Sequence, residues 1–287
     1  MRFVRFKKNQ TEGIAIQKDG VSRGLMAGEA GYPGTLDQLV AAGRPALEAA
    51  GKTLAAAPVI ELAGVAYLPP LMTPEKVICV GLNYRDHSAE SGFKQPDYPT
   101  LFNRFNSSLI GHGAPVIRPR VSTSLDYEGE LVAVIGKTGR HIANARALDH
   151  VAGYSIFNDV SVRDYQFKSP QWTVGKNFDG TGPFGPVFVT ADELPAGAKG
   201  LTLTTRLNGA VMQQASTNDM VFDIETLIAT VSEAMTLRAG DIIVTGTPSG
   251  VGQSRKPPVW MKAGDVVEVE IEKIGILSNT VADEPAA

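Results

Sequence analysis

Three acidic residues stand where a protein could hold a divalent cation. Glu128 and Glu130 are separated by one residue, and such positions in a β-strand point to the same face. Their carboxylates would lie about 7 Å apart along the strand and repel each other unless a cation lies between them. Asp159 ends the apolar run 154–158 and adds a third oxygen ligand. Three such ligands suit Mg²⁺ or Mn²⁺. The alternative is that these carboxylates lie on a solvated strand face, which is how we interpret the acidic residues of 268–272.

A histidine and a glutamate form a second candidate for chemistry. His87 and Glu90 are three residues apart, so they share a face if this segment is a helical turn. A carboxylate can hold an imidazole in one tautomer and raise its basicity, which makes the pair able to deprotonate water. A surface hydrogen bond is the simpler alternative for the same two residues.

Cationic and polar residues follow Asp159 closely. Arg163 offers a planar fork for a carboxylate, and Gln166 follows three residues later. Lys176 has apolar neighbours in the sequence, which predicts a desolvated ammonium with a lowered pKa; surface ion pairs are the alternative. The glycine-rich loop 245–252, which contains Thr247, can direct backbone N–H groups at an anion or can serve as a structural turn.

Short strands must position these residues. Apolar runs predict strands over 77–80, 131–135, 153–158 and 242–244, and the alternation of valine or isoleucine with glutamate predicts a strand near 267–271 with one buried face. Asp223 caps a predicted helix through Met235, and Gly240 prevents its continuation. Strands dominate, which favours a β-rich α+β core with mixed sheets over a doubly wound parallel sheet.

The first 72 residues are predicted to form a small N-terminal α/β module, followed by a catalytic domain over 73–287. Asp19-Gly20 offers a hairpin turn, and Thr35 with Gln38 forms a capping box. A second short helix is expected from Pro45 to Ala50, ended by Gly51.

Composition excludes several classes of protein. The 287 residues carry a net charge of −3 and give a pI near 5.9, so no basic surface for nucleic acid is expected. No apolar run is long enough for a membrane helix, and charges near the N-terminus argue against a signal peptide. The single cysteine, Cys79, excludes an intramolecular disulfide. We therefore expect a cytoplasmic protein.

The motifs occur together in one order along the chain: Val80-Gly-Leu-Asn-Tyr-Arg-Asp-His87-x-x-Glu90, Leu125-Asp-Tyr-Glu128-x-Glu130-Leu, Phe157-Asn-Asp159-x-x-x-Arg163-Asp-x-Gln166, Lys176-x-Phe-Asp and Thr245-Gly-Thr-Pro-Ser-Gly-Val-Gly252. In this combination the chain resembles the fumarylacetoacetate hydrolase family. It is similar to the bacterial acylpyruvases and 2-hydroxyhepta-2,4-diene-1,7-dioate isomerases of that family. The resemblance spans residues 73–281.

The resemblance implies a mixed β-sandwich roll, a homodimer and a small-molecule 2-oxo acid substrate. It implies the following site residues: Glu128, Glu130 and Asp159 for Mg²⁺ or Mn²⁺, His87 and Glu90 for water activation, and Lys176, Arg163, Gln166 and Thr247 for holding the substrate and stabilising its enolate. Relatives commonly have Leu-Phe-x-Lys-Pro where this chain has Leu101-Phe-Asn-Arg104-Phe105. This departure predicts a different distal substrate pocket.

The implied activity is metal-dependent hydrolysis of a C–C bond in a 2,4-dioxo acid of the acylpyruvate or fumarylpyruvate type. The products would be pyruvate and a carboxylic acid. The same site could instead serve a β-keto acid (oxaloacetate) decarboxylase or a 2-oxo acid tautomerase or isomerase. A metal-binding protein without catalysis is a further alternative, against which the presence of Lys176 and of the pair His87 and Glu90 argues.

Overall fold

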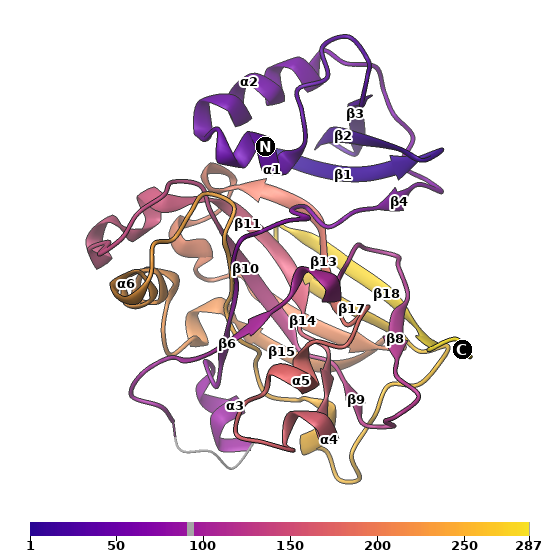
Figure 1. The fold of residues 1–287 in the computed structure, drawn as a ribbon, viewed down its shortest axis with the longest axis vertical. Coiled ribbons are helices and arrows are strands. Elements are labelled where there is room, and N and C mark those ends of the chain that lie inside the picture. The colour runs from indigo at the N-terminus through magenta and orange to yellow at the C-terminus, as the bar shows by residue number, and fades with distance from the viewer. Residues whose placement is uncertain (91–94, 287) are drawn as a thin grey trace.

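Two β-sheets packed face to face form the centre of the molecule (Figure 1). The computed structural model describes residues 1–90 and 95–286, and at residues 87–89 the backbone alone. Most strand pairs are antiparallel, while β16 with β5, β13 with β7 and β18 with β8 run parallel. The expectation of a β-rich α+β fold with mixed sheets is confirmed.

The larger sheet has the strand order β3-β2-β1-β13-β11-β10-β16-β5-β6, with β4 paired to β1 and β7 paired to β13. Its strands are β1 (Arg2–Lys8), β2 (Thr11–Lys18), β3 (Val21–Met26), β4 (Ala66–Tyr67), β5 (Val77–Gly81), β6 (Thr100–Arg104), β7 (Leu109–Ile110), β10 (Gly129–Ile135), β11 (Val151–Asn158), β13 (Gly182–Thr190) and β16 (Ile242–Val244). Each of the predicted strands at 77–80, 131–135, 153–158 and 242–244 lies within one of these.

The second sheet has the order β15-β14-β17-β18-β8, and a further pair joins β9 to β12. These strands are β8 (Val116–Arg118), β9 (Leu125–Asp126), β12 (Ser161–Val162), β14 (Thr202–Leu207), β15 (Ala210–Ser216), β17 (Val266–Ile271) and β18 (Gly275–Asp283). The α-helices are α1 (Leu36–Ala41), α2 (Arg44–Ala55), α3 (Arg85–Glu90), α4 (Arg163–Gln166), α5 (Thr173–Lys176) and α6 (Ile224–Ala234). The 3₁₀ helices are η1 (Asn106–Ser108), η2 (Asn144–His150), η3 (Ala191–Glu193), η4 (Ala196–Ala198), η5 (Thr217–Asp219) and η6 (Gly252–Ser254).

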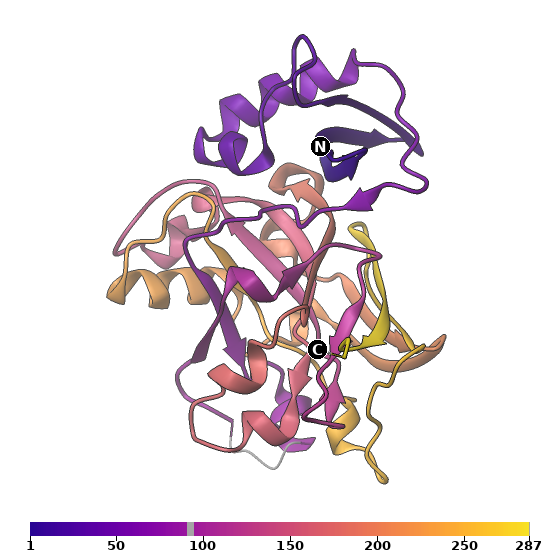
Figure 2. The ribbon, with the colours of Figure 1, turned by 45° about the vertical axis from the view of Figure 1, so that its right-hand side comes forward.

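The N-terminal strands and helices lie above the rest of the chain (Figure 2). Strand β1 continues the larger sheet, because Phe3 pairs with Phe188 of β13. The capping box of Thr35 is present. The predicted end of the second helix at Gly51 is wrong, since α2 continues to Ala55. Gly51 serves packing instead, because a Cβ there would lie 2.2 Å from the sulfur of Met1. The division into domains at residue 72 stays a prediction.

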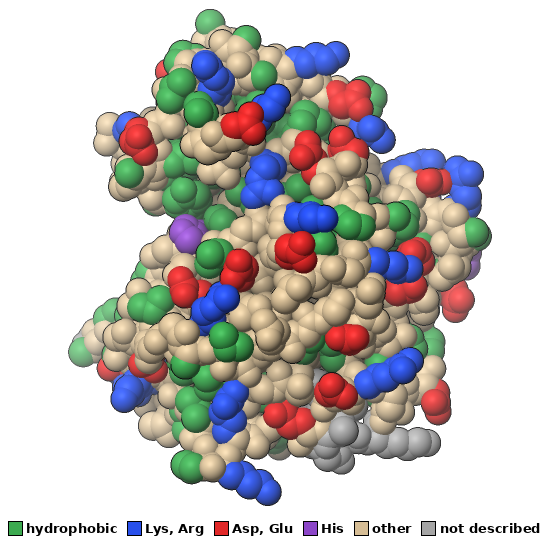
Figure 3. Space-filling model, turned by 180° about the vertical axis from the view of Figure 1, so that it is seen from behind, with side chains coloured by type: hydrophobic (Ala, Val, Ile, Leu, Met, Phe, Trp, Pro, Cys, Tyr) green, Lys and Arg blue, Asp and Glu red, His purple; other side chains and the backbone are tan. Residues whose placement is uncertain are grey.

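Helix α6 begins as expected at Asp223, whose carboxylate accepts the N–H of Thr226. It ends at Ala234, one residue before the predicted Met235, and Gly240 lies in a turn with positive φ before β16. The face seen from behind carries interspersed acidic and basic side chains without an extended patch of one sign (Figure 3). Among the described residues, no helix combines the length and apolar character needed to cross a bilayer.

Alternation along β10 decides which side chains reach the site. Gly129 faces the second sheet so closely that a Cβ there would lie 2.2 Å from Thr205 Oγ1 and 3.0 Å from Val269. Because neighbouring residues of a strand point to opposite faces, Glu128 and Glu130 lie on the other face of the larger sheet. The Glu-Gly-Glu spacing thus places two carboxylates on one face while the sandwich closes on the other.

Candidate active site

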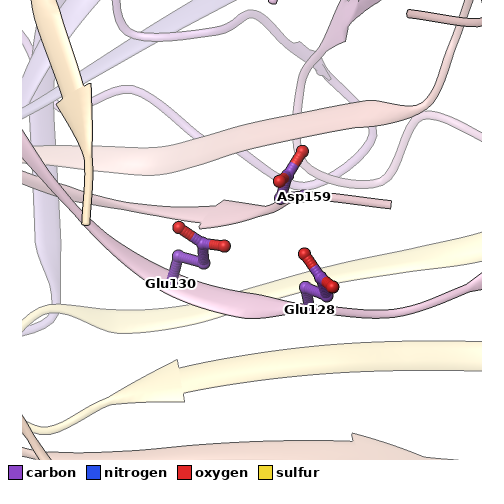
Figure 4. Close-up of side chains that lie close together, drawn as sticks. All are labelled: Glu128, Glu130 and Asp159. Carbon is purple, nitrogen blue, oxygen red and sulfur yellow. The ribbon is translucent and has the colours of Figure 1, made fainter. Parts of the chain in front are cut away.

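Three carboxylates meet on one face of the larger sheet. Glu128, directly before β10, and Glu130, within it, point toward Asp159, which directly follows β11 (Figure 4). One oxygen atom of each carboxylate lies within 4.8 Å of the others, and all three residues are buried. The antiparallel pairing of Gly129 with Asn158 brings the three together, and the Asp159 N–H donates to the Glu128 carbonyl at 2.8 Å.

The donor set fits a hard divalent cation. Three buried carboxylates need positive charge nearby, which Lys176 and two arginines supply in part and which a divalent cation could also supply. Oxygen ligands of this kind are those that Mg²⁺ and Mn²⁺ prefer, and water or a substrate can fill further positions. Neither histidine nor cysteine joins this cluster among the described residues. The three residues singled out from the sequence are therefore the residues that could hold a metal ion.

Lys176 lies between two of these carboxylates. Its Nζ is 2.5 Å from Glu128 Oε2 and 2.6 Å from Asp159 Oδ2, and its side chain is 2% exposed. Burial acts to lower the pKa of Lys176, but the attraction of Asp159 and Glu128 outweighs it, so the pKa is raised. The expectation of a lowered pKa is therefore wrong: the neighbours in the sequence are apolar, but the neighbours in space are carboxylates.

Arg163 connects the cluster to a carboxylate that sequence analysis left without a role. Its Nη2 lies 2.7 Å from Glu128 Oε1 and 2.8 Å from Asp126 Oδ2, while its Nη1 donates to Gln166 Oε1 at 2.9 Å. Asp126 also accepts the N–H groups of Gly252 and Gln253 at 2.7 and 3.0 Å. Asp126 thus fixes both Arg163 and the glycine-rich loop. In the sequence, the only indication of this role was the position of Asp126 two residues before Glu128.

Arg104 supports the cluster from another side. Its buried guanidinium donates to Asp159 Oδ1 at 2.5 Å, to the Val160 carbonyl at 3.1 Å and to Thr181 Oγ1 at 2.8 Å. Arg104 does not line the cavity described below, and Phe105 is 55% exposed. Arg104 therefore holds Asp159, and the expectation that the departure from Lys-Pro reshapes the distal pocket stays a prediction.

The loop 245–252 does direct its N–H groups at anions, but these anions are side chains of the protein. Gly246 N donates to Glu130 Oε2 at 2.5 Å, and Gly250 N lies 2.9 and 3.1 Å from the two oxygens of Glu90. Thr247 Oγ1 donates to the Gly129 carbonyl at 3.0 Å and accepts from Gln213. The loop consequently ties α3 to the start of β10.

These groups surround a cavity of ≈ 610 Å³. Its lining includes Glu90, Glu128, Glu130, Arg163, Gln166, Lys176 and Thr247, the apolar residues Phe102, Phe167 and Trp172, and the segment Gln253–Lys256. Packing is close here, because a Cβ at Gly175 would lie 2.3 Å from the Gln166 nitrogen, so α4 and α5 bring Gln166 and Lys176 together. The side chain of His87, the remaining predicted residue, lies outside the described residues, and its backbone belongs to α3.

The chain resembles known proteins over most of its length. Residues 76–282 match the family described as fumarylacetoacetate (FAA) hydrolase C-terminal. The chain belongs to the fumarylacetoacetate hydrolase family. The resemblance inferred from the motifs is thereby confirmed, and with it membership of a family of enzymes.

Individual members of the family differ in activity. The chain is 42% identical over 290 residues to the mitochondrial oxaloacetate tautomerase Fahd2a of Rattus norvegicus, covering 98% of this chain and 91% of that protein. It superimposes on the fumarylacetoacetate hydrolase of Exiguobacterium antarcticum with a TM-score of 0.86 at 39% identity, covering 99% and 100% of the two chains. For the maleylpyruvate hydrolase of Sphingobium sp. SYK-6 the TM-score is 0.81 at 31% identity, covering 99% and 100%.

Loading a divalent ion onto this family member should release a proton. Burial, and then the charges of Asp159 and Glu128, raise the pKa of Glu130 well above its usual value in the metal-free protein. A cation favours the carboxylate, so binding should release protons wherever Glu130 is still protonated, and the affinity for the cation should increase as pH rises. Titration calorimetry with Mn²⁺ in two buffers of different ionisation enthalpy measures this. Equal heats in both buffers would contradict it.

The same shift has a consequence for stability. A carboxyl group with a raised folded-state pKa binds more protons when folded than when unfolded. The metal-free protein should therefore lose stability as pH rises from the unfolded pKa of Glu130 through its folded pKa. Bound metal should abolish that loss, which thermal melts across this pH range would reveal.

Proposed function

We propose that this protein is a metal-dependent tautomerase that interconverts the keto and enol forms of oxaloacetate or a closely related 2-oxo acid. The observation that carries the proposal is the position of Lys176 Nζ, 2.5 and 2.6 Å from two carboxylates of a buried cluster that faces a cavity. The relative that matches 98% of this chain is named for this activity, which supports it further. Tautomerisation also requires fewer catalytic groups than hydrolysis, because no water molecule has to be activated for attack.

The proposed roles follow from charge and position. A divalent ion at Glu128, Glu130 and Asp159, Mg²⁺ or Mn²⁺ in this proposal, would polarise the carboxylate and 2-oxo oxygens of a substrate. Lys176 places a fixed positive charge beside the 2-oxo oxygen, where negative charge develops in the enolate. Arg163 would bind the substrate carboxylate that is adjacent to the 2-oxo group.

Other residues would orient the substrate and move its proton. Gln166 and Thr247 are proposed to bind polar atoms of the substrate, since both line the cavity and both have their side chains held by hydrogen bonds. His87 and Glu90 are proposed to transfer the proton at C3. Glu90 lines the cavity, and its carboxylate accepts the Gly250 N–H, which fixes α3 over the site.

Hydrolysis of a 2,4-dioxo acid remains the second candidate function. The similarity to a maleylpyruvate hydrolase favours it, as does the presence of His87 and Glu90, a pair able to activate water. Loss of CO₂ from oxaloacetate would use the same electron-withdrawing site. The three reactions differ in product, so one assay can separate them.

The test follows the enol absorbance and pyruvate release in the same sample of oxaloacetate, with Mg²⁺, with Mn²⁺ and with EDTA. A tautomerase should accelerate enol loss at least about tenfold over protein-free buffer containing the same metal, without matching pyruvate release, and EDTA should abolish the effect. Stoichiometric pyruvate would instead indicate decarboxylation. Cleavage of acetylpyruvate or fumarylpyruvate without any effect on the enol would indicate hydrolysis.

Assembly and location are proposed as well. Phe167 at the end of α4, Val174 in α5 and Phe105 beside β6 are 47%, 59% and 55% exposed. They lie on elements that contact one another, and exposed apolar residues of this kind support a homodimer with a second copy covering them. The cytoplasmic location stays a proposal, because the mitochondrial location in the relative's name is a statement about that protein.

A further inference from the structure

The cavity has a cationic wall that the proposed chemistry does not use. Besides the carboxylate cluster, its lining includes Gln253, Ser254, Arg255, Lys256 and Pro258, which follow the glycine-rich loop. This segment is anchored to the site, because Gly252 N and Gln253 N donate to Asp126, the carboxylate that also binds Arg163. The wall is therefore held in a fixed relation to the residues that would bind the head of the substrate.

Arg255 is held in place by neutral groups only. Its Nη2 donates to the Met212 carbonyl at 2.8 Å and to the Gly250 carbonyl at 3.3 Å, and its Nε donates to the Tyr127 hydroxyl at 3.3 Å. These contacts orient a half-buried guanidinium without neutralising its charge. Within the described part of the chain, Nη1 makes no hydrogen bond and no carboxylate forms an ion pair with Arg255.

The two buried cations of the cavity differ from the half-buried Arg255 in this respect. Arg163 is paired with Asp126 and Glu128, and Lys176 is paired with Glu128 and Asp159. A half-buried cation that is oriented but not neutralised favours an anion from outside the chain. Ligand cavities commonly obtain specificity from a few fixed polar groups, and Arg255 is such a group in a cavity that also has the apolar residues Phe102, Phe167 and Trp172 in its lining.

We propose that Arg255 binds the carboxylate at the end of the substrate remote from its 2-oxo acid head. This proposal rests on the proposed function, whose substrate oxaloacetate carries such a carboxylate, and it assigns Arg255 as the residue that selects dicarboxylic over monocarboxylic 2-oxo acids. Lys256 is exposed and adds only solvated positive charge near the same wall. Arg255 would thus determine specificity, while the carboxylate cluster and Lys176 carry out the chemistry.

The experiment compares oxaloacetate with its 4-ethyl monoester, which keeps the 2-oxo acid head and replaces the distal carboxylate with a neutral, bulkier ester; because the ester also acidifies C3–H, the change in the ratio between variants, and not the ratio itself, is decisive. The protein should prefer oxaloacetate by about 30-fold in kcat/KM, the discrimination expected when a charge-assisted hydrogen-bonded contact is lost. Arg255→Gln should remove most of this preference by slowing oxaloacetate alone, with the ester changed less than about threefold. Arg255→Lys keeps the charge but not the planar guanidinium, so its preference for oxaloacetate should lie between those of the unmodified protein and of Arg255→Gln.

The matched control is Arg146→Gln. It removes one positive charge from an exposed arginine that pairs with Asp149 and does not line the cavity, so the preference should remain. If Arg255→Gln slows both substrates equally, Arg255 has only a structural role and the proposal is overturned. Retained turnover of the ester by Arg255→Gln would also show that the site of this variant is folded.

A binding measurement separates this proposal from the proposed function. If the protein turns over neither substrate, the tautomerase proposal fails, and Mn²⁺-loaded protein is then titrated with malate and lactate, which share a 2-hydroxy acid head and differ in the distal carboxylate. Tighter binding of malate, lost in Arg255→Gln while oxalate binding is unchanged, would uphold Arg255 as the distal anion site. The absence of any preference for malate over lactate would overturn it.

Discussion

Replacing Glu128 with glutamine is expected to abolish divalent-cation binding and tautomerase activity together. Glu128 would contribute one of three carboxylate ligands, and its other contacts hold Arg163 and Lys176 at 2.7 and 2.5 Å. Removing a residue that only hydrogen-bonds to a metal ligand typically lowers metal affinity about 10–100-fold. Removing a ligand itself should therefore lower it more than about 100-fold. Mn²⁺ titration and enol turnover on the same preparation measure both effects.

The matched control is Glu268→Gln in β17, which is also a glutamate in an alternating strand but lies outside the cluster and the cavity. This variant should bind Mn²⁺ as the unmodified protein does. Glu128→Asp keeps the charge and shortens the side chain, so it should recover part of the affinity. If Glu128→Gln bound Mn²⁺ with unchanged affinity, the assignment of the metal site would be wrong.

Replacing Lys176 with methionine is expected to separate catalysis from metal binding. Removing one fixed charge that stabilises a developing oxyanion costs about 10²–10³-fold in kcat. Metal affinity should rise instead of falling, because the Lys176 ammonium occupies the same oxygens of Glu128 and Asp159 that a metal ion would use. Mn²⁺ affinity and kcat, measured side by side, would show this divergence.

The stability of the same variant provides an independent check. Without Lys176, the metal-free protein keeps buried carboxylates that have lost a cationic partner, a change that typically costs about 3–5 kcal/mol. Mn²⁺ should therefore raise the melting temperature of Lys176→Met by more than it raises that of the unmodified protein. Lys168→Met, at an exposed lysine over the ring of Tyr165, should change neither quantity. Joint loss of metal affinity and activity in Lys176→Met would contradict the separation of roles.

Features that depend on near neighbours in the chain were predictable. The hairpin turn at Asp19-Gly20, the cap at Asp223 and the strand around Leu131 follow from local backbone preference and hydrophobic alternation, and the structure contains all three. Helix ends were less predictable. Gly51 resembles a helix terminator, yet α2 continues through it because the absent side chain makes room for Met1.

Pairings between distant residues could not be predicted in the same way. Asp126 and Arg104 received no role in binding the cluster, and the pKa of Lys176 was expected to move in the wrong direction. Each of these errors concerns a contact between residues far apart in the chain. Apolar neighbours in the sequence say little about a side chain whose partners in space come from other strands.

The sequence by itself determined that Glu128 and Glu130 share a face, because the period of two residues is a property of any β-strand. Through the ordered motifs it also determined the family. Only the tertiary structure decided which charges meet. The antiparallel pairing of β10 with β11 places Asp159 beside Glu128, and the packing of α5 and β6 against this edge brings in Lys176 and Arg104. Arg255 likewise acquires its position only through contacts with Met212, Gly250 and Tyr127, because strand order and not sequence spacing sets distances across a sheet.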